Sequence, residues 1–296
     1  QVSLLFVGDI SFSGPVKYYV EHNYHSYNDT FSDVTPFIRE ADISIANLES
    51  PFVNKDMHRY EVAKAVNLDS SPEAVSALRY KPLLSCIALF SFAGFDVVTL
   101  ANNHLNDFGS IGANFTVQVL KEAGIRYIGV NYGKLNSPQE PLIMEKNGIR
   151  IGFLAYCNTY REQNEPKIFN KKRSLFASGP AFYQDEIATR DVEKLKKVVY
   201  GRLGIKPDKQ LIEAYEGNAL GNCEILKSSR LFQVTVARNG VLGAKYIPLK
   251  ILFDPETKRL HPEPIKQAKW IDVCGDEDKE CQECYKPDNM HEDKLN

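Results

Sequence analysis

Residues 100–109 have the sequence LANNHLNDFG, and they follow directly on an apolar, β-branched run at residues 96–100. Such a run predicts a short buried strand. An amide, an imidazole and a carboxylate, from Asn103, His104 and Asp107, therefore come just past the end of a strand, where α/β proteins usually bind their ligands. This segment has the composition of half a metal site.

Two earlier segments repeat this pattern of an apolar strand that runs into acidic or amide residues. Residues 4–9 read LLFVGD and end on Asp9, and residues 43–49 read ISIANLE and end on Glu49. If the three strands are parallel neighbours, their carboxyl ends lie at one edge of a sheet. We therefore expect the two carboxylates to meet the Asn103-His104 pair there.

The chain after these strands favours an α/β fold. Residues 112–123 carry apolar side chains at helical spacing, and Gly124 is suited to end that helix. Residues 126–130 read as the next strand. The order strand, helix, strand, with polar residues at the first strand's end, is the basis of the predicted fold class.

Three further helices are expected from local signals. A capping box at residues 70–73, with proline in the first turn, predicts a helix over 72–80. An apolar helix over 83–93 would end at Gly94, and residues 184–199 have an amphipathic pattern.

Two hairpins are expected at the Asn-Gly dipeptides of residues 147–148 and 239–240, which are strong turn signals between apolar runs. We expect the first hairpin to join the main sheet as an antiparallel pair.

Length and charge limit the classes of function. The chain has 296 residues, 43% hydrophobic positions and a net charge of -2, so it suits one large core and lacks a basic field for nucleic acid. Its longest apolar stretch, residues 83–95, is shorter than a membrane-spanning helix. The chain starts at Gln1 and not at methionine, which suggests that a leader or membrane anchor has been removed.

We expect a main domain over residues 1–270 and an acidic, cysteine-containing tail over 271–296. The tail has nine acidic residues against three lysines. Its cysteines and its histidine could form a zinc site, but their spacing matches no standard pattern, so disulfides or thiols in a solvated terminus are the simpler reading. The residues concerned are Cys274, Cys281, Cys284 and His291.

Carboxylate, amide and imidazole groups hold divalent metals such as Mg, Mn, Fe or Zn, and a paired site needs a bridging carboxylate. We predict that Asp9 binds one metal ion, that Glu49 bridges two, and that Asn103 offers its side-chain oxygen to the second. His104 would protonate a leaving oxygen or steady a phosphate. Asp107 would orient His104.

Simpler structural explanations exist for each residue. A Gly-Asp pair after a strand often only begins a turn, and Glu49 or Asn47 could cap the backbone near Pro51. The consecutive polar residues 102–104 are harder to explain in this way, because buried polar side chains need partners. Taken together, the three segments favour a site.

The same segments resemble the poly-γ-glutamate capsule synthesis (CapA-type) family. The resemblance is specific over residues 1–157 and resumes more loosely over 212–222. It is carried by Gly8-Asp9, by NLESP at residues 47–51, by AGFD at 93–96, by ANNH at 101–104 and by DFG at 107–109.

This resemblance implies an α/β, calcineurin-like metallophosphoesterase fold, which is an αββα sandwich with mixed sheets. It implies a metal-dependent hydrolase or transferase that acts on a phosphoester or on a polyanionic polymer such as poly-γ-glutamate. The implied cofactor is a divalent metal (Mn, Zn, Fe or Mg), and the implied partner is an anionic small molecule or polymer. The implied location is extracellular or membrane-associated.

One departure from the family qualifies these expectations. Its members carry His-Trp-Gly and Gly-His-His-Pro-His segments, whereas residues 105–260 of this chain contain no histidine. A central strand, helix and strand are therefore expected to be missing. A metal held without these nitrogen donors would bind weakly. The alternative reading is a catalytically inactive binding or structural paralogue, or a splice form.

Overall fold

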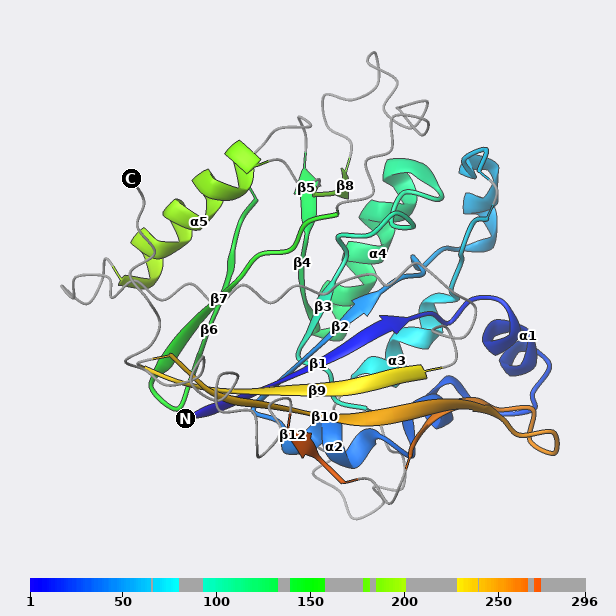
Figure 1. Cartoon of the computed structure of the whole chain (residues 1–296). Helices are drawn as coiled ribbons and strands as arrows, with labels where there is room; N and C mark the ends of the chain where they lie inside the picture. Colours follow the sequence, from blue (N-terminus) through cyan, green and yellow to red (C-terminus); the bar gives the residue numbers. More distant parts are fainter. Residues whose placement is uncertain are drawn as a thin grey trace.

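The computed structural model of the chain is built around a central mixed sheet (Figure 1). It describes residues 1–64, 66–79, 93–132, 139–157, 178–181, 185–200, 228–238, 240–265 and 269–272. The expected helix over 83–93, the loop that follows residue 157 and nearly all of the acidic tail lie outside the described residues, as does the stretch 212–222.

One half of the central sheet is parallel and comes from the first part of the chain. Its strands pair in sequence order, with Leu4 opposite Ile43, Ile45 opposite Val97, and Val97 opposite Arg126. The strands are β1 (Val2–Ile10), β2 (Ile43–Leu48), β3 (Val97–Thr99) and β4 (Arg126–Ile128). Parallel neighbours place all four carboxyl ends at one edge, which is the arrangement that the sequence predicted.

The other half is antiparallel and comes from the end of the chain. It continues the sheet in the order β11-β10-β9-β1, and β12 pairs with β10. The strands are β9 (Ser228–Ala237), β10 (Gly240–Phe253), β11 (Leu260–Pro264) and β12 (Ile271–Asp272). The predicted hairpin at residues 239–240 is confirmed by the pairing of Gly240 with Ala237. Strand β11, at the end of this strand order, carries Pro262 and Pro264.

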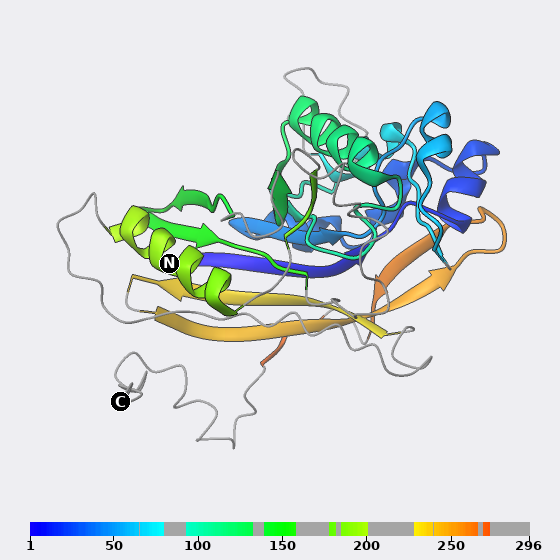
Figure 2. The same cartoon turned by 90° about the horizontal axis from the view of Figure 1, so that it is seen from above.

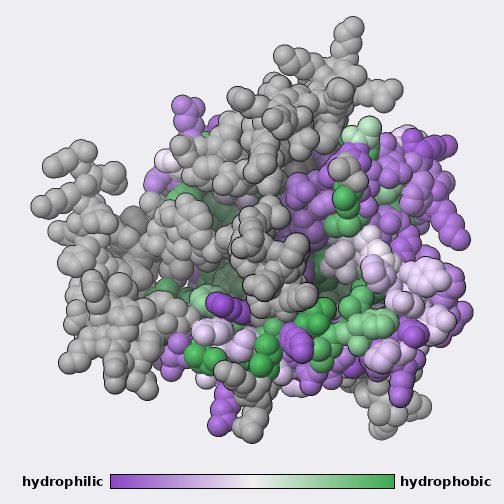
Figure 3. All heavy atoms as spheres, turned by 45° about the vertical axis from the view of Figure 1, so that its right-hand side comes forward, coloured by the Kyte–Doolittle hydropathy of each residue, from purple (hydrophilic) through white to green (hydrophobic). Residues whose placement is uncertain are grey.

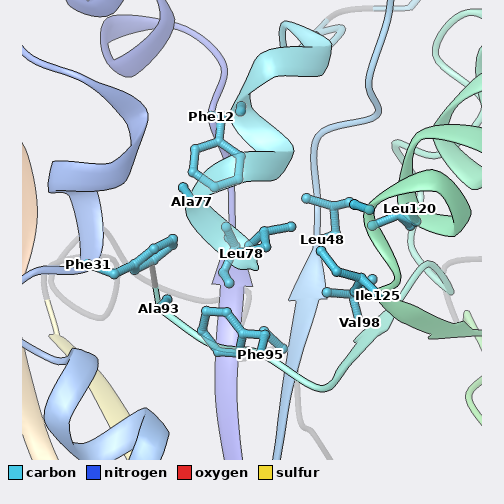
Figure 4. Packing of buried hydrophobic residues seen from close by; sticks show 14 of the residues in the cluster. Phe12, Phe31, Leu48, Ala77, Leu78, Ala93, Phe95, Val98, Leu120 and Ile125 are labelled. Carbon is cyan, nitrogen blue, oxygen red and sulfur yellow. The ribbon is translucent and has the colours of Figure 1, made fainter. Parts of the chain in front are cut away.

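The helices α1 (Pro15–Glu21), α2 (Thr35–Glu40), α3 (Val75–Leu78) and α4 (Gly109–Ala123) share one apolar cluster with alternate residues of the parallel strands. Figure 4 shows part of this core, where Leu48 and Val98 lie beside Leu120 and Ile125. The helix predicted over 112–123 is confirmed. It begins three residues earlier and ends at Gly124, whose φ of 75° is readily adopted only by glycine.

The opposite face of the sheet is covered by a hairpin and a helix. The hairpin consists of β6 (Leu142–Lys146) and β7 (Ile149–Phe153), and the helix is α5 (Asp185–Tyr200). Apolar side chains of both hairpin strands pack with Val2, Leu4 and Ile43. Figure 2 shows α5 beside this hairpin. Helices, central sheet, hairpin and α5 thus form the layers of an αββα sandwich.

Two sequence predictions about strands were wrong in detail. The hairpin at residues 147–148 forms, but as a separate two-stranded sheet, because its apolar residues face the central sheet and leave no backbone pairing with it. The strand expected over 126–130 is divided. Gly129, with a φ of 81°, bends the chain so that β5 (Val130–Tyr132) pairs with β8 (Ser178–Pro180) instead.

The expected capping box at residues 70–73 was also wrong. Ser70 is buried and its hydroxyl bonds that of Ser50 (2.6 Å), so it is unavailable as a cap. A short 3₁₀ turn, η3 (Pro72–Ala74), leads into the four-residue helix α3 instead.

Figure 3 brings the right-hand side of Figure 1 toward the viewer. This surface is mixed in character. Hydrophilic residues predominate at its upper right, and apolar residues form a band below them. Among the described helices, none combines the length and apolar character required to span a bilayer.

Candidate functional site at the carboxyl edge of the sheet

Three strand ends meet at the carboxyl edge of the parallel half. β1 ends at Ile10, β2 ends at Leu48, and β3 leads into the loop that begins at Leu100. A bulge at Gly8 shifts the register, so that Asp9 lies opposite Asn47, and Asn47 in turn lies opposite Thr99. Side chains from all three strands therefore lie within reach of one another.

The amide of Asn47 lies between the two predicted metal-binding carboxylates. Its Nδ2 atom donates to Asp9 Oδ1 (2.7 Å) and to Glu49 Oε2 (2.5 Å). Both carboxylates therefore converge on one nitrogen atom. Asp9 is exposed, whereas Asn47 is buried.

The orientation of Asn47 is set by Asn102, which is also buried. Asn102 Oδ1 accepts the backbone N–H groups of His104 and Leu105 (both 3.0 Å), so its Nδ2 must point the other way. That Nδ2 donates to Asn47 Oδ1 (3.1 Å) and to the carbonyl of Leu48 (2.8 Å). Because Asn47 Oδ1 is an acceptor in this bond, its NH₂ group faces the carboxylates.

Burial raises the pKa of the Glu49 carboxyl, and the negative charge of Asp9 raises that pKa further. The charges of His104 and Lys64 and the hydrogen bond from Asn47 oppose this effect without cancelling it. A carboxylate in this position is energetically costly to ionise. A nearby cation would lower that cost.

His104 is held from the opposite side by Asp107. Its Nδ1 atom lies 2.7 Å from Asp107 Oδ2, and its Nε2 atom lies 3.8 Å from Glu49 Oε1. A carboxylate can only accept, so Nδ1 carries the proton in this bond. In its neutral form the ring then presents a bare Nε2 toward Glu49, and in its protonated form it presents an N–H there. This is the arrangement by which a carboxylate orients a ligand or catalytic histidine.

Lys64 completes this side of the site. Its Nζ atom donates to Asp107 Oδ1 (2.5 Å) and to the carbonyl of Asn103 (2.9 Å), and it lies 3.1 Å from His104 Nδ1. Asp107, with a side chain only 1% exposed, also accepts the backbone N–H of Leu68 (2.7 Å). The loop between β2 and α3 is therefore attached to the segment that carries His104.

The predicted ligand Asn103 lies differently from the other predicted residues. It is exposed, and within the described part of the chain its side chain takes no part in the network of Asn47 and Asn102. Its backbone carbonyl is instead the acceptor for Lys64. The metal-binding role of Asn103 stays a prediction, as do the roles assigned to Asp9, Glu49, His104 and Asp107.

Sequence reasoning missed the three residues that organise the site. Asn47 was given no role beyond the alternative of a backbone cap, although an amide inside a buried strand already needs a side-chain partner. Asn102 stood in the polar triplet 102–104 without a role of its own. Lys64 gave no signal, because its partner Asp107 lies 43 residues further along the chain.

The donor atoms gathered here have the chemistry that a divalent cation requires, because carboxylate oxygens and a bare imidazole nitrogen suit Mg, Mn, Fe and Zn. The convergence of Asp9 and Glu49 on one point supports that fit. Over the described ranges, no group of three or more His, Cys, Asp and Glu side chains is arranged to hold a metal ion. The described residues would thus supply only part of a coordination shell. The tail residues of the alternative zinc site lie outside the described ranges.

A mixed α/β sandwich with polar side chains at the carboxyl edge of its parallel strands defines the class: a metallophosphoesterase-like fold. The chain belongs to the family described as bacterial capsule synthesis protein PGA_cap, whose model matches residues 3–203. This confirms the resemblance drawn from the sequence motifs.

Two curated relatives agree with this assignment. The chain is 28% identical over 161 residues to "Capsule biosynthesis protein CapA" of Bacillus anthracis, which is 54% of this chain and 36% of that protein. It is 24% identical over 157 residues to "PGA biosynthesis protein CapA" of Bacillus subtilis (strain 168), which is 53% of this chain and 37% of that protein. The chain thus matches little more than a third of the length of either relative.

Proposed function

We propose that this chain is a metal-dependent, phosphoesterase-like hydrolase that acts on a phosphoester or a polyanionic polymer, such as poly-γ-glutamate, in capsule synthesis. The observation that carries the proposal is the convergence of Asp9, Glu49 and His104 at one edge of the sheet, bridged by Asn47. The printed names of the two relatives support a role in capsule biosynthesis.

In this proposal Asp9 and Glu49 hold a divalent metal, and Asn103 adds its side-chain oxygen after a local rotation of the exposed side chain. When bound, the metal would polarise the scissile ester oxygen and lower the pKa of an attacking water. Asn47 keeps the two carboxylates together. The Nε2 of His104, oriented by Asp107, would donate a proton to the leaving oxygen when it carries one, and would receive a proton at the reacting oxygen when it is bare.

A second candidate function is anion or polymer binding without turnover. It is favoured by the Asn47 amide, which already satisfies both carboxylates, and by the absence of histidine from residues 105–260. A protein with this second function would keep the fold of the family and lose its catalytic activity.

The family relationship also motivates a proposed location outside the cytoplasm or at a membrane surface. Fractionation of cells that express the full-length protein tests this point, and recovery in the cytoplasmic fraction alone would contradict it.

Calorimetric titration with Mn(II) or Zn(II) tests the metal site on which the proposed hydrolysis depends. The wild type should take up metal in the micromolar range, and an Asp9→Ala/Asn103→Ala variant should lose it. Glu122→Gln is the matched control, because Glu122 is an exposed carboxylate on α4 that bonds only a neighbouring glutamine among the described residues. Metal uptake that the double variant retains would refute the site.

Hydrolysis of a generic phosphodiester should require the same metal and should vanish in His104→Ala. A wild type that binds metal or a polyanion but shows no turnover would favour the second candidate. Turnover that survives the loss of His104 would exclude the proton-transfer role given to that residue.

A further inference from the structure

We propose that Lys64 is a positioning residue, which fixes the His104 ring so that Nε2 faces Glu49. This inference rests on the proposed function only for the use made of Nε2. The structural claim concerns Lys64, Asp107 and His104 alone.

Within the described residues, the hydrogen-bond partners of the Lys64 ammonium lie on the segment that carries His104. Two of its donors go to Asp107 Oδ1 and to the carbonyl of Asn103 (2.5 and 2.9 Å). His104 Nδ1, 3.1 Å away, cannot accept from it while donating to Asp107 Oδ2 at 2.7 Å, and the shorter bond to a pure acceptor decides between the two. Lys64 and His104 therefore hold the two oxygens of one carboxylate.

The loop that contains Lys64 is attached by other bonds. The N–H of Val62 donates to the carbonyl of Asp107 (2.8 Å), and the N–H of Leu68 donates to its Oδ2 (2.7 Å). The two ends of this loop are also joined, because the N–H of Val53 donates to the carbonyl of Ser70 (3.0 Å). The ammonium is thus not required to fasten the loop, and its bonds serve the His104 segment.

Charge explains why a lysine is needed in this place. Asp107 is buried, and a buried carboxylate is stable only when it is paired and hydrogen-bonded. With Lys64 on Oδ1, the Oδ2 atom and its bond to His104 stay in one geometry. Without Lys64, Oδ1 loses its charged partner, and the carboxylate is held only through Oδ2, which the N–H of Leu68 and the His104 ring share.

The test is an NMR measurement on metal-free protein labelled with ¹⁵N-histidine, at fixed pH with EDTA. The wild type should show a slowly exchanging, low-field Nδ1–H signal of His104, which His104→Gln identifies by its loss and so separates from any signal of His261, whose Nδ1 lies 2.7 Å from Asp33. Lys64→Met should abolish the signal through fast exchange, and Lys64→Arg should retain it. Lys17→Met is the matched control, because Lys17 is about as exposed as Lys64 and also forms an ion pair, with the less buried Asp69.

A signal that persists in Lys64→Met, that disappears equally in Lys17→Met, or that is absent from the wild type would overturn the assignment, as would a Lys64→Arg protein that behaves like Lys64→Met. If Lys64→Met does not fold, Lys64→Gln takes its place, since it keeps a donor and removes the charge.

Titration with Mn(II) alone then separates this inference from the proposed function. We expect Lys64→Met to bind Mn(II) about as tightly as the wild type, because the proposed ligands Asp9, Glu49 and Asn103 are unchanged, and to lose most of the phosphodiester turnover assigned to His104, which Lys64→Arg should keep. A wild type that binds no Mn(II) but shows the expected NMR pattern would refute the proposed function and leave the role of Lys64 standing. Full turnover in Lys64→Met would show that the fixed ring does not serve the proposed reaction.

Discussion

The parallel and the antiparallel halves of the central sheet end in different ways. Strands β1, β2 and β3 all stop at one edge, and the residues that follow them meet there. Strands β9, β10 and β11 are antiparallel, so their ends alternate between the two edges. Only the first arrangement can collect polar side chains from three separate segments. The comparison predicts that equivalent substitutions will affect the two halves unequally.

The largest effect is expected from Asp107→Ala. This change removes a buried carboxylate that accepts from Lys64, His104 and the N–H of Leu68. The free energy of unfolding, measured with urea, should fall by about 2–3 kcal/mol, at the low end for a buried pair because Lys64 is partly exposed. Asp254→Ala, in an exposed turn beyond β10 where the carboxylate accepts only from Glu256 and Thr257 among the described residues, should cost clearly less. Equal losses would remove the distinction between the halves.

The next effect is expected from Gly129→Ala. A Cβ at this position would lie 2.6 Å from Ala101 Cβ and 2.8 Å from Ala101 N, and the φ of 81° disfavours any other residue. The free energy of unfolding should fall by about 1–3 kcal/mol, as at other overpacked or strained sites. Gly243→Ala in β10, with nothing within 4 Å of the new methyl, is the control and should change stability little.

Glu49 should give the parallel half an unusual dependence on pH. Its folded pKa is raised above the unfolded value, so its stabilising effect is complete below the unfolded pKa and is lost as pH rises through the folded pKa. In EDTA, Glu49→Gln should therefore be more stable than the wild type near neutral pH, and the difference should disappear in acid. Urea unfolding at several pH values measures this, and a variant less stable than the wild type at neutral pH would contradict it.

The smallest effect is expected from Arg259→Met in the antiparallel half. Arg259 donates to Asp33 (3.0 Å) and to the hydroxyl of Ser32 (2.6 Å), and His261 shares Asp33 (2.7 Å). Because Asp33 is exposed, the loss should be at most about 1 kcal/mol of unfolding free energy. A larger loss would mean that this ion pair holds the end of the chain to the first helices.

Local signals in the sequence predicted the elements well where side-chain periodicity and turn chemistry agree. The helix that ends at Gly124 and the hairpin at residues 147–148 are of this kind. The failed capping box at residues 70–73 shows the limit, because the hydroxyl of Ser70 is taken by Ser50, a contact that no local pattern reveals. The bend at Gly129 likewise depends on the close approach of Ala101.

The candidate site, too, could be predicted from the sequence only in part. The carboxylates and His104 could be chosen as candidates from the sequence because each lies at or shortly after the carboxyl end of an apolar strand. Lys64 and the orientation of Asn47 were not, because they depend on partners that only the folded loop brings near. Long-range pairs between a loop and a strand end leave no period in the sequence.

Pro262 and Pro264 have a consequence for how the protein behaves at high concentration. Each removes an N–H donor from β11, the strand at the outer margin of the antiparallel half. A strand from another molecule would find carbonyl groups there without the matching donors. Edge-to-edge pairing of the sheets of two molecules is therefore disfavoured along β11. This reduces the tendency of the long antiparallel hairpin to aggregate.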